Sequence, residues 1–209
     1  AEKWLEQLLP LLNAEGKRQG ELIAAQDALA IVYVQQEKYG KAERLQQQIL
    51  ALIEKRAGRH HPAVGKCLTR LAAIHRERKE YVEAERLCRE ALSIARMTVK
   101  RKELAKGTCL DALATLYAEQ EQYKKAERFY RKALAVIRRG AGKEHLYTVH
   151  CMRQLAEVYG AQKKYSKAES LLQRSLDALR KIYPDGHPDL VLVQENYDQL
   201  KRTMVANHS

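Results

Sequence analysis

The chain has 209 residues and a formal net charge of +12, from 38 lysines and arginines against 26 aspartates and glutamates. This surplus favours acidic partners: acidic peptides, nucleic acid or anionic membrane surfaces. No apolar run approaches the roughly 20 residues that cross a bilayer, which excludes membrane insertion. An aromatic content of 6% leaves few rings on which bases could stack, and this argues against nucleic acid as the partner.

One pattern recurs four times at a fixed interval of 42 residues. A tyrosine recurs at Tyr39, Tyr81, Tyr123 and Tyr165, a leucine followed by alanine at Leu29, Leu71, Leu113 and Leu155, and an alanine followed by glutamate at Ala42, Ala84, Ala126 and Ala168. Four copies in register predict a stacked array of repeats rather than a single globule, because one such unit could not bury its own apolar faces.

Each copy contains two helical patterns joined by a short link. In the third copy, apolar residues recur with a period of about 3.6 residues over 104–120 and again over 123–138. The link between them, 118–122, is long enough only for an antiparallel turn. Ala114 and Ala126 fall where the two helices must approach closely, while large side chains such as Leu113 and Phe129 fill the space between repeats. The sequence therefore predicts an all-α array of helical hairpins.

These features resemble the tetratricopeptide repeat, whose unit carries a small residue after a leucine in its first helix, an aromatic residue three positions later and an alanine in its second helix. The usual unit has about 34 residues. The 42-residue form preceded by Gly-x-x-His-Pro resembles the kinesin light chain type, and here that motif reaches its histidine at His61, His145 and His187, whereas Glu103 stands at the remaining equivalent position. The resemblance covers residues 21–204 and implies a solenoid in which the hairpins form a right-handed superhelix.

The repeat register divides the chain into consecutive segments. Residues 1–20 match the second helix of a preceding repeat. We therefore expect this chain to be part of a longer protein, whose remaining part is one of its partners. The repeats span 21–61, 62–103, 104–145 and 146–187; an unpaired helix over 188–204 caps the last one, and 205–209 form a frayed tail. Pro62 and Pro188 stand at helix starts, where proline is tolerated.

Three of the four cysteines follow the same register. Cys67, Cys109 and Cys151 occupy equivalent sites on successive first helices, which lie too far apart for a disulfide because a disulfide needs Cα atoms within about 7 Å. We interpret these cysteines as small buried core residues, which indicates a reducing compartment and hence a cytoplasmic location. Redox sensing is the alternative.

No motif for catalysis, cofactor binding or metal binding occurs: there is no nucleotide-binding loop, no HExxH and no CxxC. The three motif histidines repeat with the fold and are interpreted as structural. His75 replaces a tyrosine found in the other three repeats, which makes it a core variant. We expect a protein without enzymatic activity, cofactor or metal.

Function must then come from a surface. In tetratricopeptide arrays the first helices line a concave groove that receives peptides. Carried over residue by residue, the resemblance places this groove at Lys66, Thr69, Arg70, Ala73 and Arg76 in the second repeat, at Thr108, Asp111 and Thr115 in the third, and at His150, Arg153 and Glu157 in the fourth. The three cations of the second repeat form a basic cluster, while Asp27 and Asp111 disfavour uniformly acidic ligands.

The main hypothesis is a non-enzymatic adaptor whose groove binds a peptide segment that contains acidic residues. One alternative is a structural module that self-assembles through its end faces. Another is association with nucleic acid or anionic membrane that is driven by charge alone.

Overall fold

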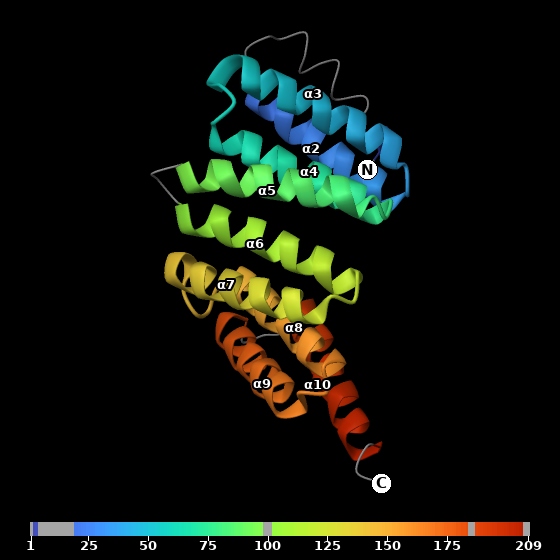
Figure 1. The fold of residues 1–209 in the computed structure, drawn as a ribbon. Helices are drawn as coiled ribbons and strands as arrows, with labels where there is room; N and C mark the ends of the chain where they lie inside the picture. The colour runs from blue at the N-terminus through green and yellow to red at the C-terminus, as the bar shows by residue number, and fades with distance from the viewer. Residues whose placement is uncertain (1, 4–18, 98–101, 184–186, 207–209) are drawn as a thin grey trace. The chain divides into compact units, whose positions relative to one another are not determined.

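The computed structural model describes residues 2–3, 19–97, 102–183 and 187–206. These residues form nine helices and no strand, which confirms the predicted all-α repeat fold (Figure 1). The helix expected within residues 1–20 lies almost entirely outside the described residues. In the described part of the chain, no helix is both long enough and apolar enough to cross a membrane.

The helices fall into two compact units, residues 1–98 and residues 99–209, called unit 1 and unit 2. Unit 1 contains α2 (Gln19–Gln35), α3 (Tyr39–Ala57), α4 (Pro62–Glu77) and α5 (Tyr81–Met97); unit 2 contains α6 (Lys102–Glu119), α7 (Tyr123–Ala141), α8 (Leu146–Ala161), α9 (Tyr165–Ile182) and α10 (Pro188–Ala206). Successive helices pack in pairs, α2 with α3, α4 with α5, α6 with α7 and α8 with α9. Within each unit the second helix of one hairpin also packs on the next first helix, so that α3 contacts α4, α7 contacts α8 and α9 contacts α10.

Alanines are buried at the same two positions of every hairpin. The exposed fraction is 0–2% at Ala30, Ala72, Ala114 and Ala156 in the first helices and 0% at Ala42, Ala84, Ala126 and Ala168 in the second helices. Side chains this small allow two helix backbones to approach closely. The leucine before each first-helix alanine is buried as well, for example Leu113 at 1% exposed. Ala114 and Ala126 are thus buried where α6 packs on α7, as expected for residues at a close approach of two helices.

The turns inside the hairpins carry a feature that hydrophobic periodicity does not predict. Glu37, Lys79, Glu121 and Lys163 have φ angles of 57–61°, one residue per hairpin at the 42-residue interval. The backbone N–H of the residue after each of these donates to a carbonyl in the last turn of the first helix; for example, Gln122 donates to Tyr117 at 2.8 Å. Glycine usually occupies such a left-handed position. The turn geometry is therefore part of the repeat although no glycine marks it.

The motif histidines begin helices. Nδ1 accepts a hydrogen bond from the backbone N–H two residues later, from Ala63 to His61 at 3.3 Å, and from Tyr147 to His145 and Asp189 to His187 at 3.2 Å. This bond satisfies one of the N–H groups that a helix leaves unpaired at its start. These histidines are thus structural, as expected. Glu103 lies inside α6, which begins at Lys102.

All four cysteines are buried and none is in a disulfide, as predicted for the three cysteines that follow the repeat register. Burial raises the pKa of the Cys67 thiol to about 11, and the nearby Asp27 carboxylate acts in the same direction. Burial also raises the pKa of Cys151. Because the thiolate is the reactive form, Cys67 and Cys151 are expected to react slowly at neutral pH.

Ala126→Leu should destabilise the protein by about 1–3 kcal/mol, because added methylene groups overpack a site with no free space. Urea unfolding followed by circular dichroism measures the change. Ala135→Leu is the matched control, since Ala135 lies on the same helix and is exposed. Equal stability of the two variants would show that α7 does not approach α6 closely at Ala126.

The folded protein at pH 7.5 should react only slowly with a thiol reagent, and the unfolded protein should release all four thiols of the sequence. Colorimetric titration before and after denaturation, on protein purified without reductant, measures both numbers. Fast native reaction at Cys67 or Cys151, or recovery of only two thiols, would contradict this assignment.

Candidate functional site

The eleven predicted groove residues all lie on first helices, on α4 in unit 1 and on α6 and α8 in unit 2. None of them is fully buried. Together with Asp27 of α2 and Asn196 of α10, they are called the first-helix face here, and each unit's part is described by itself. Ala73 is half-buried on α4 and adds a small apolar position between its polar neighbours.

In unit 1, an ion pair joins the two first helices. Nη1 of Arg70 donates to Oδ2 of Asp27 at 2.5 Å. The other carboxylate oxygen, Oδ1, accepts a hydrogen bond at 3.0 Å from Nε2 of Gln46, a buried side chain of α3. Asp27 is thereby held from both sides, and its carboxylate forms an ion pair with Arg70. Gln46 was not among the predicted residues because it belongs to a second helix.

Lys66 is the exposed cation of this part of the face. It lies on α4 one helical turn before Arg70, and among the described residues no carboxylate pairs with it. Arg76, at the other end of the same helix, donates to the neighbouring Glu77. The basic cluster expected at Lys66, Arg70 and Arg76 is therefore compensated by acids at two of its three positions, and its uncompensated charge is concentrated at Lys66.

In unit 2, the face is also of mixed charge. Nε2 of His150 on α8 lies 3.8 Å from Oδ2 of Asp111 on α6. Arg153 pairs with Glu157 one turn further along α8. The amide of Asn196 on α10 donates to the same Glu157 carboxylate at 3.2 Å. Asn196 was not predicted, although it stands 42 residues after Gln154 and so at a groove position by register.

The threonines of the face use their hydroxyl groups within the fold. Thr69 donates to the carbonyl of Gly65 at 2.9 Å and Thr108 to that of Ala105 at 2.9 Å. Thr115 donates to its own helix and lies 2.8 Å from the hydroxyl of Tyr130, a buried side chain whose pKa is raised by burial. These three residues therefore shape the surface, and charged side chains remain the groups most available to a ligand.

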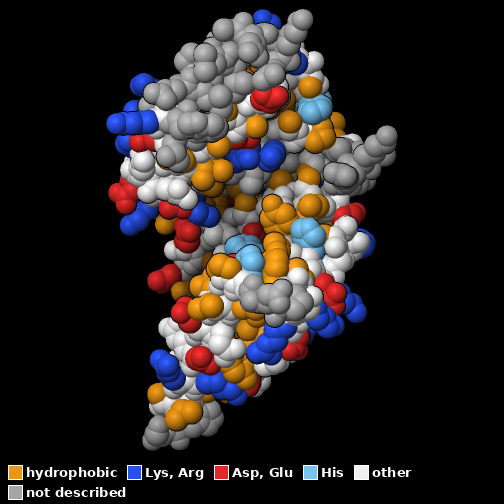
Figure 2. Space-filling model, turned by 180° about the vertical axis from the view of Figure 1, so that it is seen from behind, with side chains coloured by type: hydrophobic (Ala, Val, Ile, Leu, Met, Phe, Trp, Pro, Cys, Tyr) orange, Lys and Arg blue, Asp and Glu red, His pale blue; other side chains and the backbone are white. Residues whose placement is uncertain are grey.

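Figure 2 shows the side opposite to the view of Figure 1, where basic, acidic and hydrophobic side chains are interspersed.

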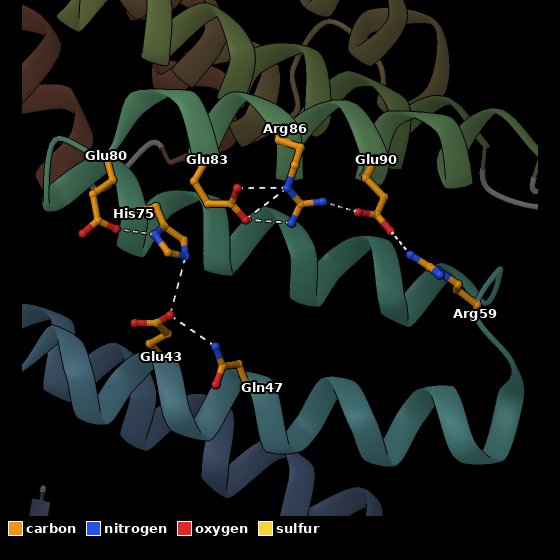
Figure 3. Close-up of polar contacts among 8 residues, drawn as sticks. All are labelled: Glu43, Gln47, Arg59, His75, Glu80, Glu83, Arg86 and Glu90. Atoms are coloured by element: carbon orange, nitrogen blue, oxygen red, sulfur yellow. Dashed lines mark hydrogen bonds and ion pairs between the residues drawn. The ribbon is translucent and has the colours of Figure 1, made fainter.

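A second polar network covers other surfaces of unit 1 (Figure 3). His75 lies between Glu80, 2.5 Å from its Nδ1, and Glu43 of α3, 3.7 Å from its Nε2. It thus joins α4 to the preceding hairpin where the other repeats carry a tyrosine. On α5, Arg86 donates to Glu83 at 2.7 and 2.9 Å and to Glu90 at 3.0 Å. The bonds from Arg86 lower the pKa of Glu83.

The family model described as Tetratricopeptide repeat matches this chain over residues 21–97, 64–139 and 108–181. A comparison with curated proteins found no significant match.

Similar solved structures include BtubC (BKLC) from P. vanneervenii, which is 19% identical with a TM-score of 0.76, over 95% of this chain and 79% of that chain. Nearly identical TPR-like repeats of the kinesin light chain type from Podosopora anserina are 20% identical with a TM-score of 0.70, over 89% of this chain and 88% of that one. A Rap protein complexed with Competence and Sporulation Factor is 16% identical with a TM-score of 0.68, over 88% of this chain and 55% of that one. At these identities the likeness shows the fold.

The Asp27–Arg70 pair should behave as one unit in a double-mutant cycle. Asp27→Asn and Arg70→Gln should each destabilise the protein by about 1 kcal/mol or more, because each leaves a half-buried charge without its partner. The double variant should lose less than the sum, with a coupling energy of about 0.5–3 kcal/mol. Urea unfolding of the four proteins measures the cycle, with Lys66→Gln as the unpaired control. Additive losses would show that the pair does not join α2 to α4.

Proposed function

The chain belongs to the tetratricopeptide repeat family, whose arrays are typically non-catalytic protein-interaction scaffolds, and we propose that its first-helix face binds a partner-protein segment that contains acidic residues. The observation that carries this proposal is Lys66. A lysine that is exposed on α4 and has no carboxylate partner among the described residues is available to a carboxylate of a ligand. Arg70 lies one turn away and uses one nitrogen, Nη1, for Asp27, so its other N–H groups remain donors for the same ligand.

The ligand that fits this face has both signs of charge. In unit 1, Asp27 lies beside Arg70. In unit 2, Asp111 lies beside His150 and Glu157 beside Arg153. A uniformly acidic peptide would therefore meet repulsion from an acidic side chain on either unit taken by itself. On unit 1, a segment with an acidic residue opposite Lys66 and a small or basic residue opposite Asp27 avoids that repulsion. Electrostatic complementarity of this kind sets the register and suppresses wrong partners more than it raises affinity.

Self-assembly through an end of the array is the second candidate, because α10 exposes apolar side chains. Val191, Leu192 and Val205 are 60%, 42% and 70% exposed. Two positions of α10 oppose this function: Gln194 and Asp198 stand where the equivalent residues of α4, α6 and α8 are buried and apolar, and they hydrogen-bond to each other at 3.0 Å. The polar pair supports the role of a cap. Light scattering measures the molar mass in solution. A mass that stays that of the monomer at all concentrations would favour the peptide-binding function over self-assembly.

Lys66→Glu should weaken the binding of mixed-charge peptides about tenfold, because one charge-assisted bond contributes roughly 1.5–3 kcal/mol before desolvation. A peptide array with Glu and Lys in every relative order supplies the probes, and fluorescence anisotropy of the best peptide measures the affinity. The variant should also bind peptides of the array that carry Lys at the position where the wild type selects Glu.

Arg44→Glu is the matched control, since Arg44 is an exposed cation on α3 and its reversal changes the net charge by the same amount. It should leave the affinity within about twofold of the wild type. An equal loss in both variants would indicate general electrostatics, and no loss in Lys66→Glu would exclude this part of the first-helix face.

A further inference from the structure

The outer side of α7 is much more basic than that of the other second helices. Helix α7 carries seven lysines and arginines against one glutamate. The corresponding numbers are four against two on α3, three against three on α5 and four against two on α9. Six of the seven cations of α7 are exposed: Lys124, Lys125, Arg128, Arg131, Lys132 and Arg139. The net surplus is therefore largest on α7, although α3 and α9 carry two cations each at the positions equivalent to Lys125, Arg128 and Lys132.

The difference between α5 and α7 is a charge reversal at equivalent positions. In α5, Arg86 lies between Glu83 and Glu90 and is hydrogen-bonded to both (Figure 3). The positions 42 residues later in α7 are Lys125, Arg128 and Lys132. The same fold position thus carries acid, base, acid in one repeat and base, base, base in the next. The three cations of α7 and their neighbour Lys124 are called the α7 basic row.

This arrangement opposes helix stability, because like charges three and four residues apart on a helix repel each other. Among the described residues, no carboxylate pairs with a member of the α7 basic row. Beside the row, Arg131 lies 4.0 Å from Glu127, a carboxylate that also accepts a 2.6 Å hydrogen bond from Lys164. A scaffold whose equivalent position is occupied by a self-compensated Glu–Arg–Glu triplet has no structural need for the row. Residues that lower stability and have no structural partner are characteristic of binding sites.

Aromatic rings fix the cations in place. Lys125 lies over the ring of Tyr117 at 5.3 Å from its centroid, and Arg128 and Lys132 lie over Phe129 at 5.3 and 5.9 Å. Tyr117 and Phe129 stack on each other at 5.4 Å. Cation–π contacts hold long side chains against the surface and lower the entropy lost when they bind a ligand.

We propose that the α7 basic row is a second docking surface, for a uniformly acidic segment of a partner protein. Nucleic acid fits less well, because the half-buried Phe129 is already covered by Tyr117, Arg128 and Lys132 and offers no free ring face to a base. The row is also short: Glu121 precedes α7 and Glu144 follows it, and both are exposed. A short run of aspartates and glutamates matches its length and charge. This surface differs from the first-helix face in its ligand, since it contains no acid to repel a uniformly acidic one.

The test transfers the charges of α5 to α7. A labelled peptide of about ten consecutive glutamates is the probe, and its affinity is measured by anisotropy in Lys66→Glu protein, so that the first-helix face does not contribute. In that background the peptide should bind, and Lys125→Glu with Lys132→Glu should weaken binding by about tenfold or more. Absence of binding before these changes, or binding that they do not alter, would overturn the proposal.

Helix α9 supplies the matched control. Lys167 and Arg174 are the equivalents of Lys125 and Lys132 one repeat later, and Lys167 lies over Tyr159 at 5.6 Å as Lys125 lies over Tyr117. Lys167→Glu with Arg174→Glu changes the net charge by the same amount and should alter the affinity less than about twofold. Equal losses would overturn the proposal in favour of net charge. A single-stranded oligonucleotide of similar charge is the last probe. If it binds to the α7 basic row more tightly than the peptide does, the proposal of an acidic protein segment is overturned in favour of nucleic acid.

Discussion

The close approach of two helices at paired alanines is the constraint on which the rest of the structure depends. Ala114 and Ala126, and their equivalents in each hairpin, are almost completely buried. Because the backbones must come this close, neither position accepts a larger side chain. The spacing of these alanines therefore fixes the length and register of the repeat. Leucines, cysteines and tyrosines then fill the layers that the alanines leave between the helices.

The buried positions were predictable because they repeat. A residue that recurs every 42 positions has the same surroundings each time, so register alone indicated that Cys67 is a core residue and that His61 is structural. That His61 caps a helix came from the structure. The left-handed turn residues were missed for a physical reason: Glu121 and its equivalents are not glycine, and hydrophobic periodicity does not report backbone dihedral angles. The turn could be recognised only as short.

The charges of the candidate site were harder to read from the sequence. Arg70 occupies its expected position, but it pairs with a residue 43 positions earlier in the chain, Asp27, and this pairing depends on how α4 packs relative to α2. The groove positions carried over from the family resemblance counted Arg70 as part of a basic cluster, whereas in the structure Lys66 is the exposed cation of that cluster. Side chains outside the buried layers are free to differ between repeats. Arg86 lies between two glutamates, whereas Arg128, at the equivalent position, lies between two lysines. In this fold the repeat specifies the scaffold, and we propose that departures from the repeat form the surfaces that recognise partners.

Amide chemical-shift mapping with acidic ligands tests the central claim, that recognition lies at such departures, most directly. With a mixed-charge peptide that carries glutamates, the account predicts shifts along α4 from Lys66 to Ala73; with a uniformly acidic peptide it predicts shifts along α7 from Lys124 to Lys132. The outer side of α5 around Arg86 should be unaffected in both titrations, since Glu83 and Glu90 already occupy its cation. Shifts of equal size on α5 and α7, or shifts spread over all exposed lysines and arginines, would contradict the account.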